Sequence, residues 1–109
     1  MNEFAEYVHE VFSLFGPIAV RRMFGGYGIY REGLMFGLVS NDLLYLKADG
    51  HNAHHFEQLG LKRFEYCRKV GKTVALSYYA APAEIMEDRD EAAIWAQRSF
   101  EAALRAKKR

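Results

Sequence analysis

The sequence has 109 residues, of which 50% are apolar and 27% charged, and its formal net charge is +1. This balance predicts one globular domain over residues 1–109, and the near-zero charge excludes a global electrostatic attraction to nucleic acid or anionic lipid. The one cysteine, Cys67, excludes an internal disulfide and favours a reducing compartment. No apolar run approaches the roughly 18 residues of a membrane span, and the N-terminus lacks the pattern of a signal peptide, so we expect a cytoplasmic protein.

An amphipathic helix is predicted at the N-terminus, because apolar residues recur there at helical spacing. These residues are Phe4, Val8, Val11, Phe12 and Phe15. Asn2 suits the N-cap, and Gly16-Pro17 is expected to end the helix.

Three short strands are expected next, over residues 27–31, 34–40 and 43–48, separated by two compact turn signals. Residues 18–24 are expected to form an irregular lead-in to the first strand. The second strand is apolar at both alternating sets of positions, which is typical of a central strand. Leu34, Phe36 and Leu38 form one set, and Met35 and Val39 form the other.

The second half of the chain predicts two helices and a hairpin. Asp49 is the expected N-cap of a short helix over residues 50–59, which Gly60 ends. Strands over residues 63–69 and 73–79 follow, around a Val70-Gly71 turn. A short helical segment over residues 82–87 then leads to a last helix over about 90–107, with Asp88 at its start.

This order, α-β3-α-β2-α, predicts the α+β class. Strands grouped in hairpins form an antiparallel sheet, here of five strands, and the helices are expected on one face of it as a second layer.

The three glycines Gly25, Gly26 and Gly28 follow an arginine pair and precede the first expected strand. Glycine beside a strand indicates a bulge or a sharp bend. A phosphate loop would precede a helix and follow a different spacing. We therefore predict a structural bend and no cofactor.

Two groups of reactive side chains are weighed and set aside. His51, His54 and His55 have spacings that can place two imidazoles on one metal ion, but no further Cys or His in the sequence supports such a site. Cys67 lies beside two cations, yet neighbours on a strand point to opposite faces. No pair of carboxylates is set apart as acid and base, so we predict no catalytic residue and no metal.

Five separated motifs together resemble a known family. They are Arg21-Arg22-Met23-Phe24-Gly25-Gly26-x-Gly28-Ile29-Tyr30, Gly33-Leu34-Met35-Phe36, Leu44-Tyr45-Leu46-Lys47, Ser77-Tyr78-Tyr79 followed by Pro82, and Trp95-Ala96. In this order and spacing they are similar to the N-terminal domain of the TfoX/Sxy family, bacterial proteins linked to the regulation of natural competence.

The resemblance implies a fold like that of the secretion chaperones and a regulatory protein that acts through other proteins. The best-known members act together with the cyclic-AMP receptor protein and carry a second, C-terminal domain that resembles a helix-hairpin-helix module. We expect no part of residues 1–109 to correspond to that second domain. The family has no established catalytic residues to carry over.

The leading interpretation is a non-enzymatic regulator of transcription or competence that binds a protein partner, such as a transcription factor or an RNA polymerase component. Its expected interaction surface contains Arg21, Arg22, Tyr78 and Tyr79, because arginine and tyrosine both suit interfaces. A structural ion pair or a backbone-capping role for the two arginines is an equally weighted alternative.

Two other classes of function stay open. Local positive clusters and sheet tyrosines would suit direct binding of nucleic acid, which is less favoured. A small enzyme, or a metal- or ligand-binding module, using the histidines or Cys67 is the third hypothesis. Self-association as a homodimer through a free sheet edge is also open.

Overall fold

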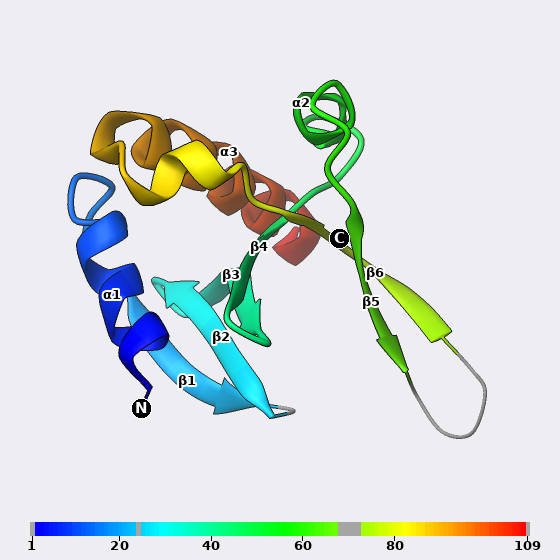
Figure 1. Ribbon diagram of the computed structural model, residues 1–109. Coiled ribbons are helices and arrows are strands. Elements are labelled where there is room, and N and C mark those ends of the chain that lie inside the picture. The colour runs from blue at the N-terminus through cyan, green and yellow to red at the C-terminus, as the bar shows by residue number, and fades with distance from the viewer. Residues whose placement is uncertain (1, 24, 68–72, 109) are drawn as a thin grey trace.

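The computed structural model describes residues 2–23, 25–67 and 73–108 of the chain (Figure 1). The strands are β1 (Ala19–Met23), β2 (Gly26–Arg31), β3 (Leu34–Ser40), β4 (Leu43–Lys47), β5 (Arg63–Cys67) and β6 (Thr73–Ala80). The helices are α1 (Glu3–Val11), α2 (Ala53–Glu57), the 3-10 segment η1 (Ala83–Met86) and α3 (Arg89–Lys107). The strands form one antiparallel sheet in the order β1-β2-β3-β4-β6-β5, which confirms the predicted α+β class.

The predicted number of strands is wrong, because the described part of the chain has six rather than five. Residues 19–23 form β1, which pairs with β2 from Ala19↔Tyr30 to Met23↔Gly26 and is not an irregular lead-in. Two consecutive arginines interrupt the alternation of apolar and polar residues by which a strand is recognised. At the edge of the sheet both side chains stay exposed, so the strand tolerates them. The expected Val70-Gly71 turn lies outside the described residues.

The hydrophobic core lies between one face of the sheet and helices α1 and α3 (Figure 1). Its fully buried side chains include Val8, Val11, Phe12, Ile29, Phe36 and Leu46. The buried face of α3 carries small residues, among them Ala92, Ala96 and Ala103, and these let the helix lie close to β3 and β4. Each large apolar side chain buried in this way stabilises the fold by about 2 kcal/mol.

A register shift in β2 and β3 changes which residues of β3 face the core. Ile29 lies opposite Gly37 but Tyr30 lies opposite Met35, so Phe36 is the extra residue of a bulge. The simple alternation predicted for β3 is therefore wrong. Phe36 and Val39 both belong to the core cluster although they are three positions apart.

Glycine is favoured at positions 25, 26 and 28 for three different structural reasons. Gly25 has a φ of +77° in the turn between β1 and β2, a conformation that favours glycine. A Cβ on Gly26 would collide with the backbone carbonyl oxygen of Val39. A Cβ on Gly28 would meet side chains instead, as described below. The register shift lies just after these glycines, between Ile29 and Tyr30 of β2, opposite the extra residue Phe36 of β3.

The helix ends agree with the sequence in part. Asn2 accepts a hydrogen bond from the Ala5 amide at 2.8 Å, and Asp88 accepts one from Glu91 at 3.1 Å, so both predicted N-caps are confirmed. Helix α1 ends at Val11, earlier than predicted, and turns continue to Phe15. Within the described residues, none of the helices combines the length and apolar character that crossing a bilayer requires.

The second helix, α2, is shorter than predicted, and Asp49 does not cap it. It spans Ala53–Glu57, and its N-cap position is Asn52. Asn52 uses its side chain to accept from the Asp49 amide at 2.7 Å and to donate to the Lys47 carbonyl at 3.0 Å. The Asp49 carboxylate is left to pair with Arg105 on α3.

Candidate protein-interaction surface

The register of the sheet places the four predicted interface residues on two faces. A row of cross-strand partners runs from Arg21 on β1 to Ala80 on β6, and such partners share a face. Tyr78 is two residues from Ala80 and therefore lies on the face of Arg21. Arg22 and Tyr79 point to the opposite face. We call the face of Arg21 the outer face and the face covered by α1 and α3 the helix face.

Methionine and tyrosine side chains gather on the outer face. This outer cluster consists of Met23, Tyr30, Met35 and Tyr78, and it lies over Gly28. A Cβ on Gly28 would be 2.8 Å from Met23 Sδ, 2.9 Å from Met35 Sδ and 2.9 Å from Tyr30 Cε1. Gly28 therefore leaves the space that the two thioethers and the ring fill. Methionine side chains adapt to different partners, so such a cluster suits a binding surface.

Cations flank the outer cluster on two sides. The Arg21 guanidinium lies over the Tyr30 ring, 5.2 Å from its centroid, and Lys47 Nζ lies 5.2 Å from the centroid of Tyr78. Arginine held against an aromatic ring keeps its charge and loses some conformational freedom. The Arg21 charge is thereby partly oriented before any partner arrives.

Tyr78 is the most buried member of the outer cluster, with 7% of its surface exposed. Its hydroxyl lies 3.5 Å from the Met35 carbonyl oxygen. Burial, with a smaller effect of Tyr30, raises the pKa of Tyr78 to about 12. Tyr78 is therefore neutral at any physiological pH and contributes mainly apolar area and shape.

Tyr79, on the helix face, is engaged within the fold. Its ring stacks on Phe56 with centroids 5.0 Å apart, and its hydroxyl donates to Glu57 Oε2 at 2.8 Å. The hydrogen bond to Glu57, together with burial, raises the pKa of Tyr79. Arg22 is exposed and forms no ion pair or side-chain hydrogen bond with another described residue.

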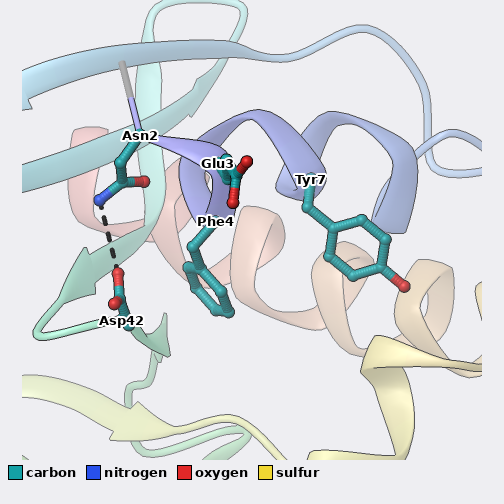
Figure 2. Close-up of a pocket in the computed structure, with 5 residues that line it drawn as sticks. All are labelled: Asn2, Glu3, Phe4, Tyr7 and Asp42. Carbon is teal, nitrogen blue, oxygen red and sulfur yellow. Dashed lines mark hydrogen bonds between the residues drawn. The ribbon is translucent and has the colours of Figure 1, made fainter.

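A pocket at the N-terminus of α1 is lined by Asn2, Glu3, Phe4, Tyr7 and Asp42, with a volume of about 700 Å³ (Figure 2). The Asn2 amide nitrogen donates to Asp42 Oδ1 at 3.4 Å, which fastens the helix start to the β3–β4 turn. The Tyr7 hydroxyl donates to the Met86 carbonyl at 2.8 Å, and Arg89 donates to that hydroxyl at 3.4 Å. The polar groups of this pocket thus serve to attach α1.

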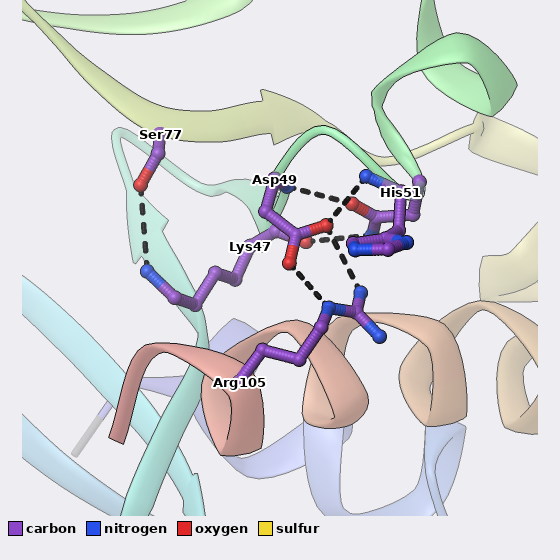
Figure 3. A network of polar contacts seen from close by, with 6 residues as sticks. Lys47, Asp49, His51, Ser77 and Arg105 are labelled. Carbon is purple, nitrogen blue, oxygen red and sulfur yellow. Dashed lines mark hydrogen bonds and ion pairs between the residues drawn. The ribbon is translucent and has the colours of Figure 1, made fainter. Parts of the chain in front are cut away.

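A second polar network joins the loop before α2 to the C-terminal part of α3 (Figure 3). Arg105 donates from Nε to Asp49 Oδ2 at 2.6 Å and from Nη2 to Oδ1 at 2.9 Å. The Asp49 carboxylate also accepts from the His51 amide at 2.9 Å. The hydrogen bonds from Arg105 lower the pKa of Asp49 to about 2. A carboxylate held ionised in this way is a weak general base.

The three histidines do not converge on one point. The rings of His54 and His55 are 4.0 Å apart, and His55 meets the edge of Trp95 at 6.1 Å. Burial, with Arg98 and His54 nearby, lowers the pKa of His55. Among the described residues, no group of three or more His, Cys, Asp or Glu side chains could hold a metal ion. The side chain of Cys67 lies outside the described part.

Three members of the outer cluster, Met23, Tyr30 and Met35, are not part of the interaction surface that the sequence predicts. Met23 lies in a strand that was not predicted, and Met35 and Tyr30 become partners only through the register shift. The signal that could have found them is Gly28 itself, since a glycine within a strand indicates that other groups approach closely.

The comparison with known families and proteins agrees with these motifs. Residues 10–103 match the TfoX N-terminal domain. The chain is 36% identical over 74 residues to the DNA transformation protein TfoX1 of Aliivibrio fischeri, which covers 68% of this chain and 34% of the relative. It is 31% identical over 91 residues to the DNA transformation protein TfoX of Haemophilus influenzae, and this match covers 79% of this chain and 42% of the relative.

A third relative is the protein Sxy of Escherichia coli, 28% identical over 98 residues, with 90% of this chain and 46% of the relative covered. The chain thus matches less than half the length of each of these relatives. The family match covers most of the sequence, including the arginine pair, the glycines and the strands that carry the outer cluster. The chain belongs to the TfoX N-terminal domain family.

Proposed function

We propose that this chain is a non-enzymatic regulatory protein that acts in the control of DNA transformation by binding a protein partner from the transcription machinery. The proposed role in DNA transformation is supported by two relatives that are named as DNA transformation proteins. The proposal centres the interaction on Arg21 and Arg22 and extends it over the outer cluster, including Tyr78. Tyr79 supports this surface from beneath through Phe56 and Glu57.

The observation that carries the proposal is the placement of two adjacent, exposed arginines on an edge strand of the sheet. The equally weighted alternative is a structural ion pair or a backbone-capping role for the two arginines. The structure describes no carboxylate that pairs with either arginine within its described residues. An exposed arginine contributes little to folding, whereas arginine is enriched at protein interfaces.

The experiment is quantitative affinity capture from a bacterial lysate with three proteins. They are the wild type, the double variant Arg21→Ala/Arg22→Ala, and the control Lys107→Ala/Lys108→Ala, which removes the same charge from the end of α3. Circular dichroism first establishes that all three are equally folded. We expect a set of partners that only the first variant loses. Identical partner sets for all three proteins would contradict the proposed surface.

A regulatory role in DNA transformation is tested separately. Transformation frequency is measured in a naturally competent host that lacks this chain and is complemented with each of the three proteins. We expect the wild type and the lysine control to restore the frequency and the arginine variant to fail. Equal restoration by all three would argue that the arginine pair has no part in the process.

A further inference from the structure

We infer that β1 binds its partner by accepting an extended, acidic segment as a seventh strand of the sheet. This inference rests on the proposed function and names the chemistry of the partner. Edge strands present unpaired backbone groups that can pair with another chain, and strand addition is a recurring mode of peptide recognition.

The first observation is the free edge of β1. β1 pairs with β2 on one side only and is the terminal strand of the sheet. Outside that pairing, the backbone of Ala19–Met23 makes no hydrogen bond with any other described residue. The pairing of β1 is uninterrupted through its five positions, so an incoming strand would find a continuous row of donors and acceptors.

The second observation is the charge on this edge. Successive residues of a strand point to opposite faces, so Arg21 and Arg22 flank an added strand from both sides. The other edge strand, β5, differs because it carries Arg63 and Glu65 together. The apolar residues Val20 and Met23 lie on either side of the arginine pair. The complementary segment therefore has two consecutive acidic residues with an apolar residue before and after them.

The third observation is a hollow of about 290 Å³ beside the start of β1, lined in part by Ala19, Arg21, Tyr30, Arg31 and Glu32. Arg31 is fixed there by a hydrogen bond to the Phe15 carbonyl at 2.7 Å and by its contact with the Phe15 ring. Two arginines and one glutamate thus border the hollow. Its size suits one side chain of the added segment, and its charge favours an acidic one.

The same charges argue against a second copy of the chain on this edge. Two β1 strands related by a two-fold axis would place Arg21 opposite Arg21, since it is the central residue of the strand. Like charges directly opposite each other in a sheet are destabilising. An acidic segment of another protein removes that repulsion and replaces it with attraction.

The test measures the fluorescence anisotropy of a labelled peptide, Thr-Val-Glu-Glu-Val-Thr, in the presence of the wild-type protein. A matched peptide has both glutamates replaced by lysine. Two further peptides are N-methylated at one or the other alternate set of residues. A strand added to an edge uses only one set of its amides, so one methylated peptide should lose binding and the other should keep it.

We expect Arg21→Glu to weaken binding of the acidic peptide about tenfold and to leave the fold unchanged, since a rim ion pair is replaced by repulsion. The control Lys107→Glu, which changes an exposed lysine in the last turn of α3, should have no such effect. Strand addition would be overturned if both N-methylated peptides bound as tightly as the unmodified acidic peptide. It would also be overturned if the acidic peptide did not bind at all. In that case the proposed function would still be supported if the Arg21→Ala/Arg22→Ala variant lost its partners in the capture experiment.

Two other occupants are outcomes of the same experiment. A dimer in sedimentation velocity that the acidic peptide fails to dissociate, with β1 amides protected in the free protein, would assign the edge to a second copy. Displacement of the peptide by a short DNA duplex, with a steep dependence on salt, would assign it to nucleic acid. Either result would contradict the inference.

Discussion

Replacing Asp49 by asparagine tests the polar network between the α2 loop and α3. The change keeps the shape of the side chain and the acceptor for the His51 amide but removes the charge that Arg105 binds at 2.6 Å and 2.9 Å. We expect Asp49→Asn to destabilise the protein, because the bidentate ion pair with Arg105 becomes a weaker hydrogen bond to a neutral amide.

The magnitude follows from the pKa of Asp49. Arg105 lowers that pKa from 3.8 to about 2, which corresponds to about 2 kcal/mol of stabilisation. The side chains of Arg105 and Asp49 are 34% and 15% exposed, so solvent screens the pair and about 1–2 kcal/mol is expected. For a domain of this size, such a loss lowers Tm by roughly 4–8 °C.

The pH dependence has a definite sign. A carboxyl whose pKa is lowered in the folded state stabilises the fold above its unfolded pKa, and this contribution is lost as the pH falls through the folded pKa. The difference in unfolding free energy between wild type and Asp49→Asn should therefore be constant above about pH 5. It should shrink between the unfolded value of 3.8 and the folded value of about 2.

The assay is urea denaturation followed by circular dichroism at several pH values. Glu32→Gln is the control, because Glu32 pairs with Arg31 at 3.7 Å while 69% of its side chain is exposed, and it should change stability by less than about 0.5 kcal/mol. A change below about 0.5 kcal/mol for Asp49→Asn at neutral pH, or a difference that persists unchanged down to pH 2, would refute the reasoning.

Three further predictions concern single positions. Gly26→Ala should lower the free energy of unfolding by about 3 kcal/mol or more, because the new Cβ meets the rigid Val39 carbonyl. Gly28→Ala should lower it by about 1 kcal/mol, because there the new Cβ meets the ends of side chains. Equal urea midpoints for the two variants would contradict this. Ser99→Ala should be neutral or raise stability by about 1 kcal/mol in the same assay, since the buried Ser99 hydroxyl has no hydrogen-bond partner among the described residues; a clear loss of stability would indicate an unseen partner. Titration at 295 nm should show the tyrosine absorbance that Tyr78→Phe removes developing only near pH 12, with stability falling above the ordinary pKa of 10.0; ionisation of Tyr78 near pH 10 would contradict its burial.

Much of the fold follows from local signals in the sequence. Asn2 and Asp88 cap their helices as predicted, because an N-cap depends only on residues within one turn. The order of the elements follows from apolar periodicity and from turn residues such as Gly60, which has the expected left-handed conformation with a φ of +69°. These features require no knowledge of distant partners.

The features that the sequence did not reveal depend on contacts between distant segments. β1 is a strand because β2 pairs with it, although its own arginines hide the pattern. Asp49 looked like an N-cap because nothing local indicates that Arg105, 56 positions later, competes for its carboxylate. The bulge at Phe36 changes the face of β3 in a way that only the paired register shows.

The candidate surface shows the same division. The exposure of Arg21 and Arg22 was anticipated from their chemistry, and the structure places both on the edge strand. Tyr78 and Tyr79 were grouped from sequence as one patch, yet adjacent residues of a strand face opposite sides. Alternation alone would have separated them. The partnership of Tyr78 with Tyr30 and Met35 needed the sheet order, which local patterns do not give.

Amide hydrogen exchange of the protein, free and bound to a partner recovered by the capture experiment, examines the edge strand itself. The partner should slow exchange of the outward-pointing amides of Ala19–Met23, with smaller effects at Tyr30 and along the start of β2. The control is the complex prepared with Lys107→Ala/Lys108→Ala, which should show the same pattern. Protection confined to β5, α2 or α3, with β1 exchanging at its free rate in the complex, would show that the partner binds elsewhere.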